Sequence, residues 1–204
     1  MKIAILVEGK TEKTFIEGKV RDFIISRVRQ RPSLRPIVSK GRISKEGDLK
    51  RTVEYLLDDY DVVIALTDVY TSSNYKIPRD FKDAADAKAK MRAWVGNNPK
   101  FYPHAAQYDF EAWLLPYWST IQKLVGQKQS APPGQPEQVN HTKPPSKRIM
   151  EFFETSKRGV SYNKIIHSKH ILEKNDLLIS ANACPELKAF LNTILSLCGG
   201  EIIA

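Results

Sequence analysis

The sequence predicts an α/β protein whose parallel sheet is covered by helices on both faces. Short apolar segments alternate with longer segments of helical periodicity, starting with residues 3–7 and 11–29. This order is typical of parallel strands joined by helices. Residues 61–67 contain a second strong apolar run, and each run ends in a carboxylate, Glu8 or Asp68. Runs this apolar are buried on both sides, as in the centre of a parallel sheet.

The rest of the chain continues the alternation before it becomes wholly helical. Pro36 lacks a backbone N–H, so a strand at 34–39 is expected at an edge of the sheet. Ser146 is the expected N-cap of its helix, because its hydroxyl can accept a hydrogen bond from a free backbone N–H. We expect a further strand at 100–107 and helices at 46–58, 80–95, 108–124, 146–153, 163–178 and 185–197.

The composition divides the chain into three segments. Residues 1–125 are expected to form the α/β domain, and residues 146–204 a C-terminal helical appendage packed on the same domain. Between them, residues 126–145 contain five prolines and are expected to form a Pro-rich loop. The 204 residues are enough to bury a complete core without disulfides.

The charge balance favours a polyanionic partner. The chain has 32 basic and 23 acidic residues, a net charge of +9. Nucleic acid fits this excess better than an acidic membrane surface, and the alternative is charge that only maintains solubility. Two cysteines are too few for a disulfide framework. No apolar stretch approaches the roughly 18 residues of a membrane span, and no signal peptide is recognised, so we expect a cytoplasmic protein outside the membrane.

The carboxylates that follow the strands are the first candidate site. Glu8 follows the first strand, Asp68 the third and Glu111 the fourth. The carboxyl ends of parallel strands meet at one edge of a sheet. Carboxylate oxygens suit Mg²⁺ or Mn²⁺, and a cation would offset the repulsion between them. The alternative is that each is an ordinary polar residue at a strand end, with Glu8 capping the next helix.

Four basic residues are candidates for contacts with phosphate. Lys10 lies at the start of the first helix, where free N–H groups favour an anion. Lys147, Arg148 and Lys164 lie in the expected appendage. All four would position a nucleic-acid backbone without reading its sequence. The alternative is a solvated positive face.

Several short motifs resemble a known family. Val-Glu-Gly-Lys-Thr-Glu at 7–12 and Leu-Thr-Asp-Val-Tyr at 66–70 are similar to motifs of the Toprim domain of topoisomerases, primases and the overcoming-lysogenization-defect nucleases. Over residues 1–197 the chain more closely resembles the Toprim-like domain-of-unknown-function family 4276 (DUF 4276). The later motifs are Tyr-Asp-Phe-Glu-Ala-Trp-Leu-Leu at 108–115, Pro-Pro-Ser-Lys-Arg-Ile at 144–149, Tyr-Asn-Lys at 162–164 and Cys-Pro-Glu-Leu at 184–187.

The resemblance implies a Toprim-like (Rossmann-like) fold and Mg²⁺-dependent cleavage of phosphodiester bonds. It also implies a partner, because relatives of the family are often paired with an ABC-type ATPase in bacterial defence against phage. Glu8 takes the place of the Toprim glutamate, a general acid or base, and Asp68 that of the first aspartate of the Asp-x-Asp metal motif. The second aspartate position is Tyr70, so we expect Asp109 or Glu111 to supply the missing oxygen ligand.

The sequence therefore leaves two main functions open. The first is a Mg²⁺-dependent nuclease acting on DNA or RNA, with Glu8, Asp68 and Glu111 as catalytic residues and Asp109 beside them at the metal. The alternative is a non-catalytic Toprim-like subunit that binds an ATPase partner or nucleic acid, which Tyr70 in place of an aspartate favours. A small-molecule phosphohydrolase is disfavoured by the positive charge. The choice of DNA or RNA stays open, and so does the oligomeric state, a homodimer included.

Overall fold

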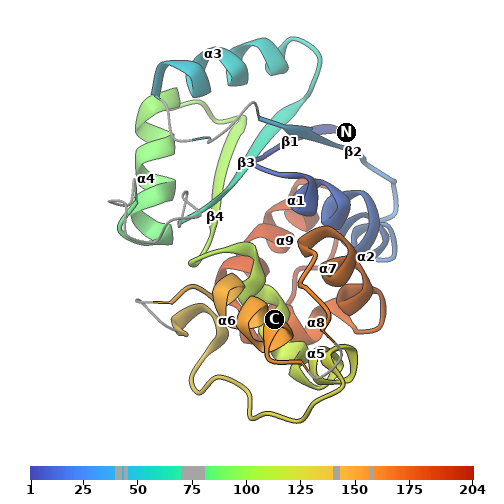
Figure 1. Ribbon diagram of the computed structural model, residues 1–204. Helices are drawn as coiled ribbons and strands as arrows, with labels where there is room; N and C mark the ends of the chain where they lie inside the picture. The colour runs from blue at the N-terminus through green and yellow to red at the C-terminus, as the bar shows by residue number, and fades with distance from the viewer. Residues whose placement is uncertain (40–42, 44–45, 70–80, 140–142, 157–158) are drawn as a thin grey trace.

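A parallel sheet is the framework of the molecule (Figure 1). The computed structural model describes residues 1–39, 43, 46–69, 81–139, 143–156 and 159–204. Within these residues the sheet has four parallel strands in the order β2-β1-β3-β4. The strands are β1 (Lys2–Val7), β2 (Ser33–Val38), β3 (Val62–Asp68) and β4 (Phe101–Ala106). The predicted α/β fold is confirmed, and β2, which contains Pro36, lies at an edge.

The apolar sequence of β1 explains its place inside the sheet. Ile3 and Ile5 belong to the hydrophobic cluster on one face, and Ala4 and Leu6 belong to the cluster on the other. Neighbouring side chains of a strand point to opposite faces, so a strand that is covered on both must be apolar throughout. The same argument holds for β3, which lies beside β1 and contributes alternate residues to the same two clusters.

Helices cover both faces of this sheet (Figure 1). One face carries α3 (Glu46–Leu57) and α4 (Ala84–Val95). The opposite face carries α1 (Lys10–Phe15), the π-helical turn η1 (Ile16–Val20), α2 (Arg21–Ile25) and α9 (Pro185–Leu197). The helix predicted at 11–29 is thus interrupted by a π-helical turn and ends at Ile25. None of the described helices has both the length and the apolar character required to cross a membrane.

The remaining elements form the helical half of the molecule, below the sheet in Figure 1. They are η2 (Phe110–Tyr117), α5 (Trp118–Val125), η3 (Pro136–Gln138), α6 (Pro145–Glu154), α7 (Lys164–Glu173) and α8 (Leu177–Ala183). Trp113 of η2 joins this half to the sheet side, because its ring lies 6.0 Å from that of Phe15 and 6.4 Å from that of Phe190. One hydrophobic cluster therefore contains residues from both sides of the expected 126–145 loop. The division of the chain at 125 and 146 stays a prediction.

The single helix predicted at 163–178 is wrong. The structure has two helices there, α7 and α8, separated by a short turn. Asn175 in that turn donates through Nδ2 to the Ile171 carbonyl at 2.6 Å, and the Asp176 side chain caps α8. Asparagine and aspartate side chains compete in this way for backbone partners that a continuous helix would use.

Two further helix expectations are corrected by proline. The N-cap of α6 is Pro144 rather than Ser146, and a proline follows at the first helical position, where its missing N–H is not needed. The N–H of Ser146 instead donates to Asp109 Oδ2 at 3.1 Å. The segment expected as one helix at 108–124 begins as the 3₁₀ helix η2, which contains Pro116 and continues into α5 only afterwards.

We predict that Phe190→Ala lowers the free energy of unfolding by about 3–5 kcal/mol, the usual loss for a buried phenylalanine. Phe190 is fully buried, and its ring lies 5.6 Å from that of His104 on β4 and 6.4 Å from that of Trp113. Urea denaturation measures the loss, with Lys188→Ala on the same helix as the control. A loss below about 1 kcal/mol, or two separate transitions, would contradict a core shared by the sheet and the helical half.

Candidate functional site

The register of the sheet brings two carboxylates to neighbouring strand ends. Val7 pairs with Leu66, so Glu8 lies directly after β1 and beside Thr67 of β3. The Thr67 hydroxyl donates to Glu8 Oε1, and the Ile43 N–H donates to the same oxygen at 3.4 Å. Glu8 is therefore held in a fixed orientation at the carboxyl end of the central strand.

Glu12, in the first turn of α1, is a further carboxylate of this site. Its Oε2 is buried and has no hydrogen-bond partner among the described residues. Burial raises the pKa of Glu12, and the negative charge of Glu111 raises it further, whereas Lys164 lowers it. A Cβ atom at Gly9 would lie 2.7 Å from Glu12 Oε2, so a larger residue at position 9 would displace this carboxylate. The sequence analysis does not single out Glu12, and its place in the first turn of the helix after β1 is the signal that could have found it.

Asp68, the last residue of β3, shares this site. Its pKa is raised well above the ordinary value, first by removal of the carboxylate from water and then by the charges of Glu12, Glu8 and Asp109. The ammonium of Lys164 opposes the shift. The charges of Glu12, Glu8, Asp109 and Lys164 therefore all act on the Asp68 carboxyl.

Asp109 follows β4 and is 3% exposed. Burial and the nearby charge of Glu111 raise its pKa to about 7, while a hydrogen bond from Ser146 and the charge of Lys164 act in the other direction. Its Oδ1 is buried without a hydrogen-bond partner among the described residues. One oxygen of this carboxylate is thus fixed by the start of α6 and the other is left for an additional partner.

Glu111 is the most buried carboxylate of the site, at 1% exposed. Lys164 Nζ lies 3.1 Å from its Oε1 and 3.3 Å from its Oε2. The Tyr162 hydroxyl donates to Glu111 Oε1 at 3.5 Å and lies 3.1 Å from Ser168 Oγ. Although burial lowers the pKa of Lys164, the carboxylates of Glu111, Asp109 and Asp68 outweigh it and raise that pKa. Lys164 therefore stays charged and is a counter-ion of the carboxylates.

We call the carboxylates Glu8, Glu12, Asp68, Asp109 and Glu111 the acidic cluster. Lys164, which the sequence predicts as a phosphate contact, forms an ion pair with Glu111 in the structure. A contact between residues 53 positions apart leaves no local pattern in the sequence, so it could not be read there. Tyr70, the departure from the Toprim pattern, lies outside the described residues.

The other expected phosphate contacts are spread over two places. Lys10 is exposed at the start of α1, beside Glu8 in sequence. Lys147 lies in the first turn of α6, next to the N–H that holds Asp109. Arg148 faces a separate pocket of about 510 Å³, where it lies with Lys143 and Trp118, and its Nε is buried without a hydrogen-bond partner in the described chain. Lys10 and Lys147 thus lie beside residues that belong to the acidic cluster or contact it. Arg148 lines a different pocket.

The donor set of the acidic cluster fits a hard divalent cation. Oxygen ligands from carboxylates suit Mg²⁺ and Mn²⁺, and two buried oxygens, Glu12 Oε2 and Asp109 Oδ1, lack any other partner within the described residues. Within the described chain, however, no group of three or more Asp, Glu, His and Cys side chains is already arranged to hold a metal ion. The chemistry therefore fits, and binding would require the side chains to move from the positions that Lys164 now stabilises.

Fold and site together define a parallel α/β protein with acidic side chains at the carboxyl edge of its sheet. The chain belongs to the family described as "domain of unknown function (DUF4276)", whose model matches residues 7–195, and the family predicted from the motifs is confirmed. No curated protein matches the chain. Among solved structures, the C-terminal region of the Burkholderia pseudomallei OLD protein is similar at 11% identity and a TM-score of 0.48, covering 97% of this chain and 98% of that one.

The raised pKa of Asp109 predicts a pH-dependent loss of stability in the absence of metal. The pKa is about 7 in the folded chain and about 3.9 in an unfolded one, so only the folded state keeps the proton between these values. The free energy of unfolding should therefore fall as pH rises from about 4 to about 7. Asp109→Asn removes this titration. The free energy of unfolding of the variant minus that of the native protein should therefore be larger at pH 8 than at pH 4, by on the order of 2–4 kcal/mol.

Urea denaturation in EDTA at the two pH values measures this difference. Asp22→Asn, at an exposed position of α2, is the control and should give the same change at both. An Asp109→Asn effect that is equal at both pH values would show that the Asp109 carboxyl does not titrate in this range.

Proposed function

We propose that this protein is a Toprim-like nuclease that cleaves phosphodiester bonds in DNA or RNA with Mg²⁺ or Mn²⁺. The observation that supports the proposal is the acidic cluster. Its carboxylates come from two adjacent strand ends, a helix and the segment after β4, and they raise one another's pKa values. Glu8 and Asp68 follow the first and third strands, which are neighbours in the sheet. This is the arrangement that the resemblance to Toprim domains implies.

A bound divalent cation would offset the repulsion between the carboxylates and would polarise a phosphate oxygen. Asp68, Asp109 and Glu111 are the side chains we assign to hold it, with Glu12 as an additional oxygen donor. Asp109 or Glu111 would then provide the oxygen ligand of the second Toprim aspartate, whose position in this chain is Tyr70. Glu12 Oε2 and Asp109 Oδ1 have no hydrogen-bond partner among the described residues, which supports this assignment.

Two other side chains have distinct roles in the proposal. Hydrolysis of a phosphodiester requires a proton to leave the attacking water and a proton to reach the departing oxygen. We assign this transfer to Glu8, whose carboxylate is oriented by Thr67 and by the Ile43 N–H. The ammonium of Lys164, whose side chain is 54% exposed, is placed to offset negative charge that develops on the phosphate.

The net charge of +9 supports a nucleic acid as the substrate. Lys10 and Lys147 are the residues proposed to contact phosphates beside the cluster, and Arg148 would contact the strand farther along. The resemblance further supports an ABC-type ATPase as a partner and phage defence in the cytoplasm as the setting. If no cleavage occurs, the chain would be the non-catalytic subunit that the same resemblance allows.

We predict metal-dependent cleavage that Glu8→Gln lowers by at least about 100-fold, the usual contribution of a general acid or base. The assay incubates plasmid DNA and RNA with the pure protein in Mg²⁺, in Mn²⁺ and in EDTA. Glu17→Gln, at an exposed position of the adjoining helical turn η1, is the matched control and should cleave normally. Cleavage that persists in Glu8→Gln or in EDTA would contradict the mechanism, and no cleavage in either metal would support the non-catalytic alternative.

We also predict that Lys147→Ala weakens nucleic-acid binding and reduces the slope of log affinity against log salt concentration by about one. The reason is that one phosphate contact releases about one counterion from the nucleic acid. Lys50→Ala, on α3, is the control because it removes the same charge from a different face. Fluorescence anisotropy at several salt concentrations in EDTA measures both quantities, and an unchanged slope would exclude Lys147 as a phosphate contact.

A further inference from the structure

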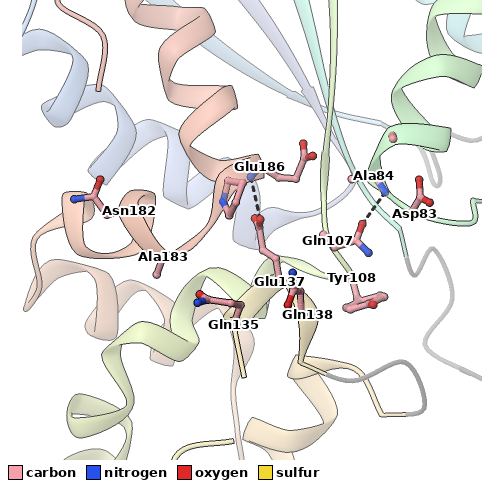
Figure 2. Close-up of a pocket in the computed structure, with 12 residues that line it drawn as sticks. Asp83, Ala84, Gln107, Tyr108, Gln135, Glu137, Gln138, Asn182, Ala183 and Glu186 are labelled. Carbon is pink, nitrogen blue, oxygen red and sulfur yellow. Dashed lines mark hydrogen bonds between the residues drawn. The ribbon is translucent and has the colours of Figure 1, made fainter. Parts of the chain in front are cut away.

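A second site lies past the end of β4. It is a pocket of about 420 Å³ between the start of α4, the residues that follow β4, the 3₁₀ turn η3 and the junction of α8 and α9 (Figure 2). This volume lies in the range of pockets that hold small ligands. None of the acidic cluster's side chains lines it.

The charged side chains of the pocket wall already have partners. Glu186 accepts from Lys88 Nζ through both carboxylate oxygens, at 2.8 and 2.6 Å. Glu137 accepts from Trp113 Nε1 and from the Glu186 N–H, each at 2.9 Å. Asp83 caps α4, where the helix dipole favours a negative charge. Among the described residues no lysine or arginine lines the pocket, so the wall favours an uncharged ligand over an anion.

Carboxamides supply the remaining hydrogen-bonding groups. Gln107, Gln135, Gln138 and Asn182 all line the pocket, and we call it the amide pocket (Figure 2). Gln107 Oε1 accepts from the Ala84 N–H at 2.6 Å, which fixes this side chain. A carboxamide presents a donor and an acceptor side by side, which is the pattern that Asn and Gln use to bind the edge of a base.

The amide pocket lies within reach of a nucleotide bound at the acidic cluster. Gln107 and Tyr108 line the pocket, and the next residue, Asp109, belongs to the acidic cluster. Asp68 pairs with Ala106, so Gln107 is one residue beyond the strand that adjoins Asp68. Adjacent strands are about 4.8 Å apart, so the backbone at Gln107 lies less than the length of a nucleotide from that at Asp68. With a phosphate at the cluster, the amide pocket is therefore a candidate site for the attached base.

We propose that the amide pocket binds an unpaired nucleobase next to the phosphodiester that is cleaved. This inference deepens the proposed nuclease function and rests on it for the position of the phosphate. A base inside a duplex has its hydrogen-bonding edge paired and its faces stacked, so it cannot enter a pocket without being turned out. The site therefore selects single-stranded or unpaired nucleic acid.

Nucleosides test the pocket separately from cleavage, because they contain a base and no phosphate. Calorimetric titration of the full chain with adenosine, guanosine, cytidine and uridine in EDTA should show saturable binding of at least one, with a Kd no weaker than about 1 mM. Ala85→Trp fills the pocket from an exposed position of α4 and should weaken this binding at least tenfold. Ala93→Trp is the matched control, exposed on the same helix about 12 Å farther along, and should bind normally.

A second variant tests the same pocket in case Ala85→Trp does not fold. Gln138→Ala with Asn182→Ala removes two exposed carboxamides and should also weaken nucleoside binding. Glu8→Gln should lower cleavage and leave nucleoside binding unchanged. A failure of the nuclease proposal can therefore be told apart from a failure of the base site. No saturable binding of any nucleoside, or equal binding in Ala85→Trp and Ala93→Trp, would overturn the proposal.

Discussion

Electrostatic repulsion among partly buried carboxylates governs the chemistry of the strand-end site. Burial and neighbouring negative charges together raise the pKa values of Asp68, Asp109 and Glu12. Such a group of acids is unfavourable unless positive charge or protons compensate it. In the described chain Lys164 is the cation whose charge acts on these carboxylates and on Glu111. Its side chain remains about half exposed, at 54%, so solvent and ligands can reach the ion pair.

The helical half completes this site rather than merely covering the core. The first turn of α6 donates to Asp109, η2 carries Glu111, and α7 begins at Lys164. Trp113 and Phe190 connect these helices to the sheet through one hydrophobic cluster. A change in how the helical half packs would therefore alter the charge balance at the strand ends. The amide pocket lies between α4 and the same helical half, so both sites depend on this packing.

The parts of the fold that depend on local pattern could be predicted from the sequence. The apolar runs of β1 and β3 specify buried parallel strands, and their topology places Glu8 and Asp68 at one edge. The parts set by tertiary contacts could not. The ion pair of Lys164 with Glu111 joins distant segments. At the break between α7 and α8, Asn175 donates a hydrogen bond to the Thr120 hydroxyl of α5, a partner 55 residues away that no local pattern indicates.

Anomalous scattering from a crystal of the protein soaked in Mn²⁺ would locate the ion without any assay of activity. We expect a peak within bonding distance of carboxylate oxygens of Asp68, Asp109 and Glu111, with Lys164 Nζ displaced from Glu111. An Asp68→Asn crystal soaked in parallel should show a weaker peak or none. A protein with no anomalous peak at the acidic cluster, and with Lys164 still paired to Glu111, would contradict a metal-binding role for these carboxylates.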